Sequence, residues 1–116
     1  MTRGELNELG SLILDACLKV HTILGPGLLE SVYTHALLTE FGLRGIKARH
    51  NVPVPLFYKT IDTGKCFEID ILVENEIIIE AKSVEIMHPV FDAQIISYLK
   101  LADKRLGYLV NFKGYR

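Results

Sequence analysis

The sequence predicts one α/β domain over residues 1–116, with helices packed over a mixed sheet and elements in the order ααβββαβ. Three observations support this prediction. Apolar residues recur at helical spacing in two stretches near the start and one near the end. Between and after these stretches lie short runs rich in β-branched residues, bounded by turns. The chain is also long enough for a real core, because folding at this length buries roughly two-thirds of the unfolded surface.

Two helices are predicted over residues 5–24 and 28–41, separated by the helix-breaking Gly-Pro-Gly at 25–27. The first carries a continuous apolar stripe. Leu14 and Leu18 lie beyond this stripe, and the wide apolar arc that results predicts a homodimer. The second helix is expected to bury four residues, which are Val32, Ala36, Leu37 and Phe41.

A first strand is predicted over residues 51–59, where Pro53 and Pro55 favour an edge position because proline cannot donate to a sheet. It follows a basic connector over 44–49 and precedes a turn over 62–65. A third helix is predicted to begin at Pro89 and to extend to residue 102. The last strand covers residues 106–112.

The most informative stretch is the predicted hairpin over residues 67–83, FEIDILVENEIIIEAKS. If its turn is the tripeptide 74–76, Asp70 faces Glu80 across the two strands, and Lys82 lies on the same face two residues later. A register shift of one residue would send the two acids to opposite faces. The simpler alternative is an exposed sheet face on which Lys82 bridges the two acids.

Asp70 followed by Glu80-Ala81-Lys82 resembles the D…(D/E)xK signature of the PD-(D/E)XK nuclease superfamily. Residues 27–33, GLLESVY, are similar to the GxxExxY motif of one bacterial and archaeal subgroup of that superfamily. The resemblance extends over about residues 12–112 and implies a restriction-endonuclease-like core. Two positions depart from the pattern: Ile69 replaces the proline of the superfamily name, and Phe91 stands where relatives often carry histidine.

The resemblance implies a metal-dependent phosphodiesterase acting on nucleic acid, with DNA favoured over RNA. Asp70, Glu80 and the backbone carbonyl of Ala81 would bind Mg²⁺ or Mn²⁺, an all-oxygen set suited to a hard cation. Lys82 would be catalytic, by orienting the attacking water or stabilising charge in the transition state. Glu30 would contribute through a water molecule or a second ion. Without the resemblance, Glu30 is explained by the preference for acids in the first turn of a helix.

The resemblance also implies that Tyr33, Gln94 and Tyr98 position the substrate. Gln94 and Tyr98 are four residues apart and therefore share a helix face. The structural alternative is that Tyr98 belongs to the core and Gln94 lies at its margin. For the whole chain, the alternative is a non-catalytic nucleic-acid- or protein-binding module that keeps the nuclease fold, since a fold alone does not establish activity.

Composition limits the remaining classes of function. The formal net charge is −1, so bulk charge gives no support to nucleic-acid binding, although a basic cluster at Arg44, Lys47, Arg49 and His50 could meet phosphate. The sequence contains no run of 18 apolar residues, so no membrane span is predicted. It has no apolar segment near its start, so no secretion signal is predicted. The two cysteines lack metal-ligand spacing and are expected to be reduced thiols of a cytoplasmic protein.

Overall fold

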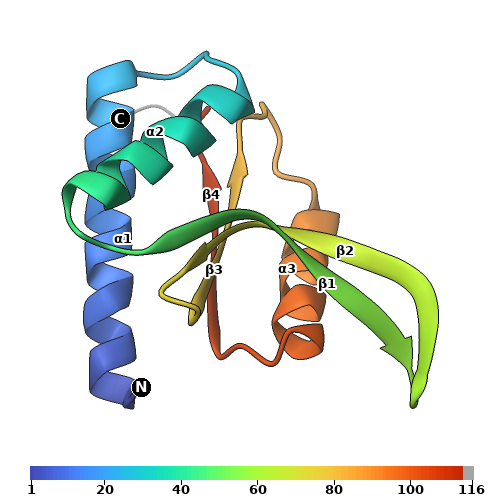
Figure 1. The fold of residues 1–116 in the computed structure, drawn as a ribbon. Helices are drawn as coiled ribbons and strands as arrows, with labels where there is room; N and C mark the ends of the chain where they lie inside the picture. Colours follow the sequence, from blue (N-terminus) through green and yellow to red (C-terminus); the bar gives the residue numbers. More distant parts are fainter. Residues whose placement is uncertain (114–116) are drawn as a thin grey trace.

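The computed structural model describes residues 1–113 and confirms the predicted order ααβββαβ. Figure 1 shows a central sheet with two helices on one side and one on the other. The elements are α1 (Arg3–Leu24), α2 (Glu30–Leu43), β1 (Ala48–Tyr58), β2 (Ile61–Val73), β3 (Ile77–Lys82), α3 (Pro89–Leu101) and β4 (Leu106–Asn111).

The four strands form one mixed sheet in the order β1-β2-β3-β4. β1, β2 and β3 are antiparallel neighbours, whereas β4 lies parallel to β3. The parallel pair requires a crossover, and α3 supplies it. β2 and β3, which carry the two predicted acids, are therefore the inner strands of the sheet, with β1 and β4 at its edges.

The hydrophobic core is divided between the two faces of the sheet. α1 and α2 pack against one face, where Ile71 and Ile79 are fully buried. α3 packs against the other face through Ile95, which belongs to the same cluster as Leu72 and Ile78. The alternation along β2 and β3 follows the two-residue period of a strand, so each inner strand contributes to both cores.

Local sequence explains the helix ends. Thr2 and Glu5 form a reciprocal capping box at the start of α1, and Gly25 ends this helix with a φ of 73°, a conformation that favours glycine. Pro89 is the first residue of α3, and Nδ1 of the preceding His88 accepts a hydrogen bond of 3.0 Å from the Val90 backbone amide.

Three details differ from the sequence-based expectation. β1 starts at Ala48 rather than 51, because Ala48 pairs with Val73 and extends the ladder into the expected connector. The turn between β1 and β2 lies at residues 59–60 rather than 62–65, and β2 already starts at Ile61. Val32 is 41% exposed, because α2 turns Tyr33, Thr34, Leu37 and Phe41 toward the core instead.

The two leucines beyond the stripe of α1 are exposed, Leu14 by 43% and Leu18 by 67%. Within residues 1–113, no helix combines the length and the apolar character needed to cross a membrane.

Candidate active site

The hairpin of β2 and β3 brings Asp70 and Glu80 together. The predicted register is confirmed, because Val73 pairs with Ile77 and Ile71 with Ile79. One residue further, at Asp70 and Glu80, the two strands are joined by hydrogen bonds between backbone amides and carboxylates instead of backbone pairs. The Asp70 amide donates to Glu80 Oε1 at 3.3 Å, and the Ala81 amide donates to Asp70 Oδ2 at 3.0 Å. Each acid thus holds the strand of the other, and the pair is fixed where β2 and β3 begin to separate.

Both carboxyl groups are poorly solvated. Glu80 is only 8% exposed, and its pKa is raised to about 7. Burial is the main cause, the hydrogen bond from the Asp70 amide opposes it, and the Asp70 carboxylate adds to it. Burial also raises the pKa of Asp70, although the Ala81 amide, His50 and Lys82 oppose this. A buried and a half-buried acid side by side, both with raised pKa values, are a common feature of functional sites. Any nearby positive charge would restore their ionised forms.

Lys82 lies on the face expected for it but does not pair with the acids. Within residues 1–113 it forms no ion pair with Asp70 or Glu80. Its ammonium group instead lies 4.6 Å from the centre of the Phe91 ring on α3, which is within the range of a cation–π contact. The alternative in which Lys82 merely bridges two acids is therefore not what the structure shows. The aromatic ring at position 91 takes part in holding the lysine.

Glu30 reaches the site from the start of α2. It is the first residue of that helix and is exposed, and its charge contributes to raising the pKa of Glu80. The loop before it is anchored to the end of β3, because the Ser83 hydroxyl donates to the Leu28 carbonyl at 2.9 Å. Ser83 directly follows Lys82, so this hydrogen bond ties the loop before Glu30 to the end of the strand that carries Lys82.

Tyr33 is fully buried and does not contact the acid pair. Its hydroxyl donates to the Gly25 carbonyl and accepts from the Leu28 amide at 3.2 Å, and its ring stacks on Phe112 with centroids 4.5 Å apart. Tyr33 therefore shapes the loop that leads into Glu30. A direct role in positioning substrate stays a prediction, and the observed contacts favour an indirect one.

Tyr98 and Gln94 lie one turn apart on α3 but in different environments. Tyr98 is half-buried and stacks on Phe67 of β2 with ring centroids 4.3 Å apart. Burial raises its pKa, and the Glu80 charge adds to this effect, which places its ring near the acid pair. Gln94 is exposed. Its amide is thus free to meet a ligand, but within residues 1–113 it makes no hydrogen bond that ties it to Lys82.

Two histidines, which the sequence analysis did not identify as site residues, lie next to the acid pair. His50 Nε2 lies 4.0 Å from Asp70 Oδ1, and the His35 ring of α2 meets the His50 ring edge-on at 5.4 Å. Asn51, opposite Asp70, has a φ of 53° and interrupts the β1–β2 ladder there. The only sequence signal was the basic cluster that includes His50. The pairing of β1 with β2 brings His50 to Asp70. This pairing is hard to derive from the sequence, because the two prolines of β1 weaken its strand pattern.

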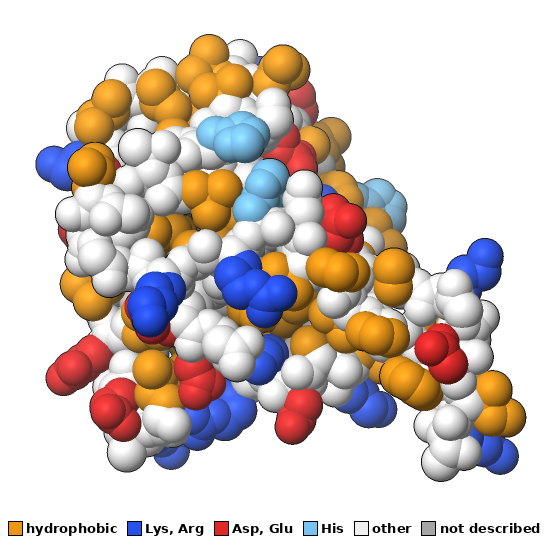
Figure 2. Space-filling view, viewed as in Figure 1, with side chains coloured by type: hydrophobic (Ala, Val, Ile, Leu, Met, Phe, Trp, Pro, Cys, Tyr) orange, Lys and Arg blue, Asp and Glu red, His pale blue; other side chains and the backbone are white. Residues whose placement is uncertain are grey.

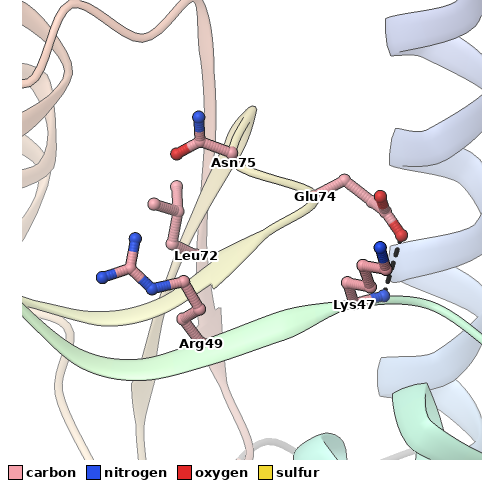
Figure 3. A pocket seen from close by; sticks show the side chains of 5 residues that line it. All are labelled: Lys47, Arg49, Leu72, Glu74 and Asn75. Atoms are coloured by element: carbon pink, nitrogen blue, oxygen red, sulfur yellow. Dashed lines mark hydrogen bonds between the residues drawn. The ribbon is translucent and has the colours of Figure 1, made fainter.

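The other members of the basic cluster separate in the structure. Arg44 is committed to Asp15 at 2.9 Å and Glu40 at 2.7 Å, so it is not available for phosphate. Arg49 and Lys47 line a recess of about 270 Å³ together with Leu72, Glu74 and Asn75. Figure 3 shows the Arg49 guanidinium beside Leu72, while the Glu74 carboxylate turns away to accept a 2.8 Å hydrogen bond from the Lys47 amide.

This recess lies one row from the acid pair on the same side of the sheet. Arg49 pairs with Leu72 and Leu72 with Ile78, and directly opposed residues share a face. Asp70 lies two residues before Leu72 on β2 and Glu80 lies two residues after Ile78 on β3, a step of roughly 7 Å. Within the described part of the chain, Arg49 forms no ion pair. Its guanidinium is therefore available to an anion bound next to the acids.

The donor set fits a hard divalent cation. Asp70, Glu80 and the Ala81 carbonyl offer oxygen atoms only, which Mg²⁺ and Mn²⁺ prefer over softer ligands. Neither carboxylate forms an ion pair with a lysine or arginine within residues 1–113, so the charge of the pair is only partly compensated, by Lys82 and His50 at longer range, when both acids are ionised. No group of three or more histidine, cysteine, aspartate or glutamate side chains is arranged for metal binding in those residues. Binding would thus rest on the two carboxylates, the carbonyl and water.

Comparison with known proteins gives one match. Residues 7–116 match the protein-family model described as the PD-(D/E)XK nuclease superfamily. No curated protein and no solved structure matches the chain in the corresponding comparisons. The matched range includes both acids, the lysine, α2, α3 and α1 from its fifth residue onward.

Proposed function

Because this chain belongs to the PD-(D/E)XK nuclease superfamily, we propose that it is a Mg²⁺- or Mn²⁺-dependent nuclease that hydrolyses phosphodiester bonds in nucleic acid. The observation that carries the proposal is the pair of half-buried Asp70 and buried Glu80, both with raised pKa values, next to a lysine that forms an ion pair with neither acid within residues 1–113. A structural ion pair would have used Lys82 to compensate the acids. Here the arrangement leaves room for an added cation.

Asp70, Glu80 and the Ala81 carbonyl would hold the cation, which supplies Lewis-acid polarisation of the scissile phosphate and a lowered pKa for the attacking water. Lys82 would stabilise the negative charge that develops on the phosphoryl oxygens as water attacks phosphorus and the ester bond breaks. The Phe91 ring restricts the ammonium group, so Lys82 is held ready for this role. Glu30 would act from the edge of the site, through a water molecule or a second ion.

Substrate contacts would come from α3 and from β1. Gln94 presents an exposed amide one turn from Tyr98, whose ring lies near Glu80. Arg49 would bind a phosphate next to the scissile one, because the step of roughly 7 Å between neighbouring rows is of the order of the separation between adjacent phosphates on one strand. Arginine is well suited to phosphate because its planar fork donates two parallel hydrogen bonds.

Within the superfamily we assign the chain to the GxxExxY group and treat residues 1–116 as one catalytic domain. Tyr33 and Ser83 anchor the loop before Glu30. This supports the assignment, because one motif residue, Tyr33, then fixes the loop that positions the other, Glu30. The exposed Leu14 and Leu18 support a homodimer through α1. Cys17 and Cys66 are both free, which supports a reducing, cytoplasmic location.

The decisive experiment is a nuclease assay on single- and double-stranded DNA and RNA, with EDTA, Mg²⁺ or Mn²⁺, for wild type and Lys82→Ala. We expect cleavage only with added metal and a loss of about 10²–10³ in rate for Lys82→Ala, the usual effect of removing one donor that stabilises transition-state charge. Lys19→Ala, which removes an exposed lysine of α1, serves as the matched control and should cleave normally.

Full activity of Lys82→Ala would remove this residue from the mechanism. If the wild type binds nucleic acid but cleaves none of the substrates with either metal, the binding-module alternative becomes the better description of the protein.

A further inference from the structure

The pairing of β1 with β2 continues well beyond the body of the molecule. Residues 56–65, which we name the β1–β2 arm, form the far end of this pair, and Figure 1 shows the arm projecting away from the three helices. The projection contributes to a longest molecular dimension of 45 Å against a shortest of 20 Å. No helix of the fold covers the arm in that view, so its side chains are presented to the surroundings.

The tip of the arm is apolar and carries two lysines and one acid, Asp62. Phe57, Tyr58 and Ile61 are 52%, 68% and 68% exposed, and Tyr58 pairs directly with Ile61 across the turn. The Lys59 ammonium lies 5.8 Å from the centre of the Tyr58 ring, and Lys65 stands on the returning strand. Figure 2 shows hydrophobic side chains together with basic and acidic ones on this projection. Three large apolar residues at one exposed tip indicate a contact surface.

The arm is braced rather than loose. The Thr63 hydroxyl donates to the Leu56 carbonyl at 2.6 Å across the strands, and its oxygen accepts from the Lys65 amide at 3.2 Å. The Gly64 amide donates to Asp62 Oδ1 at 2.8 Å. These contacts accompany the register shift between Leu56 and Phe57, and such a shift increases strand twist. The tip is therefore held in a defined direction relative to β2.

β2 connects the tip to the acid pair without a break. Ile61 and Asp70 belong to the same strand, and nine residues at about 3.4 Å each give a reach of at most about 30 Å. One turn of duplex DNA rises by about 34 Å. A two-stranded β-ribbon also fits the major groove of B-form DNA, whereas the major groove of duplex RNA is too deep and narrow for side chains to read.

We propose that the β1–β2 arm grips duplex DNA about one helical turn from the acid pair, with Tyr58 and Ile61, which share one face of the arm, in a groove and Lys59 and Lys65 on flanking phosphates. The inference rests on the proposed nuclease function and names its substrate as a DNA duplex longer than the active site itself. Continuity with the acid strand and the two lysines of the arm, which outnumber its one acid, Asp62, favour this partner.

A second copy of the chain is the less favoured occupant. Strand addition along β1 would need backbone amides at its open edge, and Pro53 and Pro55 in this strand have none to donate.

The test compares two DNA duplexes, each held closed by a terminal loop and labelled with a fluorophore, with Ca²⁺ in place of Mg²⁺ so that binding is measured without cleavage. One duplex of about 6 base pairs is too short to reach both the acid pair and the tip, and one of about 20 base pairs spans both. For the double variant Tyr58→Ser, Ile61→Ser we expect binding of the long duplex to weaken by about tenfold or more, the scale of one lost aromatic contact. Binding of the short duplex by this variant should stay within about twofold of wild type, because this duplex does not reach the tip and loses no stacking contact there.

Leu43→Ser is the matched control, because it removes another apolar side chain that is 80% exposed, at the end of α2. It should bind both duplexes as wild type does. The variant Lys59→Ala, Lys65→Ala should lower the salt dependence of binding by about two phosphate contacts for the long duplex alone.

Equal losses on both duplexes, or no loss on either, would overturn the arm proposal while leaving the nuclease function intact. Light scattering gives the competing outcome: an assembly larger than the 13.1 kDa chain that falls apart in the arm variant but not in Leu43→Ser would assign the arm to a second copy. Absence of any duplex binding by wild type would overturn both the arm proposal and the choice of DNA as substrate.

Discussion

At the scale of single residues, Glu80 is the group whose protonation is most strongly tied to folding. Its pKa is raised from an ordinary 4.5 to about 7, chiefly by burial. The folded chain therefore binds this proton more tightly than the unfolded chain does. In the metal-free protein, the stabilisation that follows is complete below the ordinary pKa of 4.5 and is lost as pH rises through about 7.

This asymmetry predicts the behaviour of Glu80→Gln, which keeps the shape of the side chain and removes its charge. In EDTA, the free energy of unfolding of wild type should fall relative to that of the variant by about 3 kcal/mol as pH rises from the ordinary pKa to above the raised one. The two proteins should be similar in acid, and the variant should be the more stable above neutral pH. Urea unfolding across this pH range measures the difference.

Glu8→Gln, at an exposed position of α1, controls for the loss of one negative charge and should follow wild type. A constant difference between wild type and Glu80→Gln at all pH values would contradict the origin that we assign to the raised pKa.

The site residues that could be predicted are those fixed by the hairpin register alone. A three-residue turn and a period of two suffice to bring Asp70, Glu80 and Lys82 to one face, and the ladder confirms that register. His50, Phe91 and Ser83 could not be derived in this way. Each reaches the site from a segment whose position depends on tertiary packing: β1 on its pairing with β2, Phe91 on the docking of α3, and Ser83 on its bond to the Leu28 loop.

At the scale of elements, periodicity predicted the three helices well and the first hairpin less well. α1 and α3 have strong apolar stripes and marked ends, so their residues could be assigned closely. The β1–β2 turn was misplaced because Asp62 and Gly64 have the composition of a turn, yet they lie within β2 next to the register shift. Lys59, at the true turn, has a φ of 58°. Lysine gives no sequence signal for that conformation.

The contact between α1 and β4 depends on a glycine. A Cβ atom added at Gly10 would lie 2.4 Å from the Tyr108 hydroxyl oxygen, with the next atom of that side chain 3.4 Å away. At Gly42 in α2, by contrast, an added Cβ would meet nothing within 4 Å. Glycine in a helix interior costs about 1 kcal/mol relative to alanine, so the two positions should respond to alanine in opposite directions.

We expect Gly42→Ala to stabilise the protein by about 0.5–1 kcal/mol and Gly10→Ala to destabilise it by about 1–2 kcal/mol, because crowding outweighs the helix gain. Tyr108→Phe removes only the clashing oxygen. In that background Gly10→Ala should become neutral or stabilising, and a double-mutant cycle in urea measures the coupling. Independent effects of the two substitutions would mean that the hydroxyl does not set the spacing of α1 and β4.

At the scale of the whole molecule, the two cores meet at the strands that carry the acids. Ile71 and Ile79 belong to the core under α1 and α2, while Leu72 and Ile78 belong to the core under α3. Asp70 directly precedes Ile71 on β2 and Glu80 directly follows Ile79 on β3, so both lie just beyond the last backbone pair of the two strands. Packing on both sides of the sheet thus holds two like charges close together. Their repulsion lowers the free energy of unfolding of the whole domain.

A cation that binds the acid pair should therefore stabilise the entire fold. A metal that binds only the folded protein adds about 2.7 kcal/mol at a hundredfold excess over its dissociation constant. For a domain of this size the gain corresponds to a rise of roughly 10 °C in melting temperature. Glu80→Gln, with one ligand charge removed, should lose most of that rise although its metal-free form is the more stable one above neutral pH. The measurement is the melting temperature of both proteins at pH above neutral, with EDTA and with saturating Mn²⁺. An equal response of the two proteins to Mn²⁺ would show that the stabilising ion binds somewhere other than between Asp70 and Glu80.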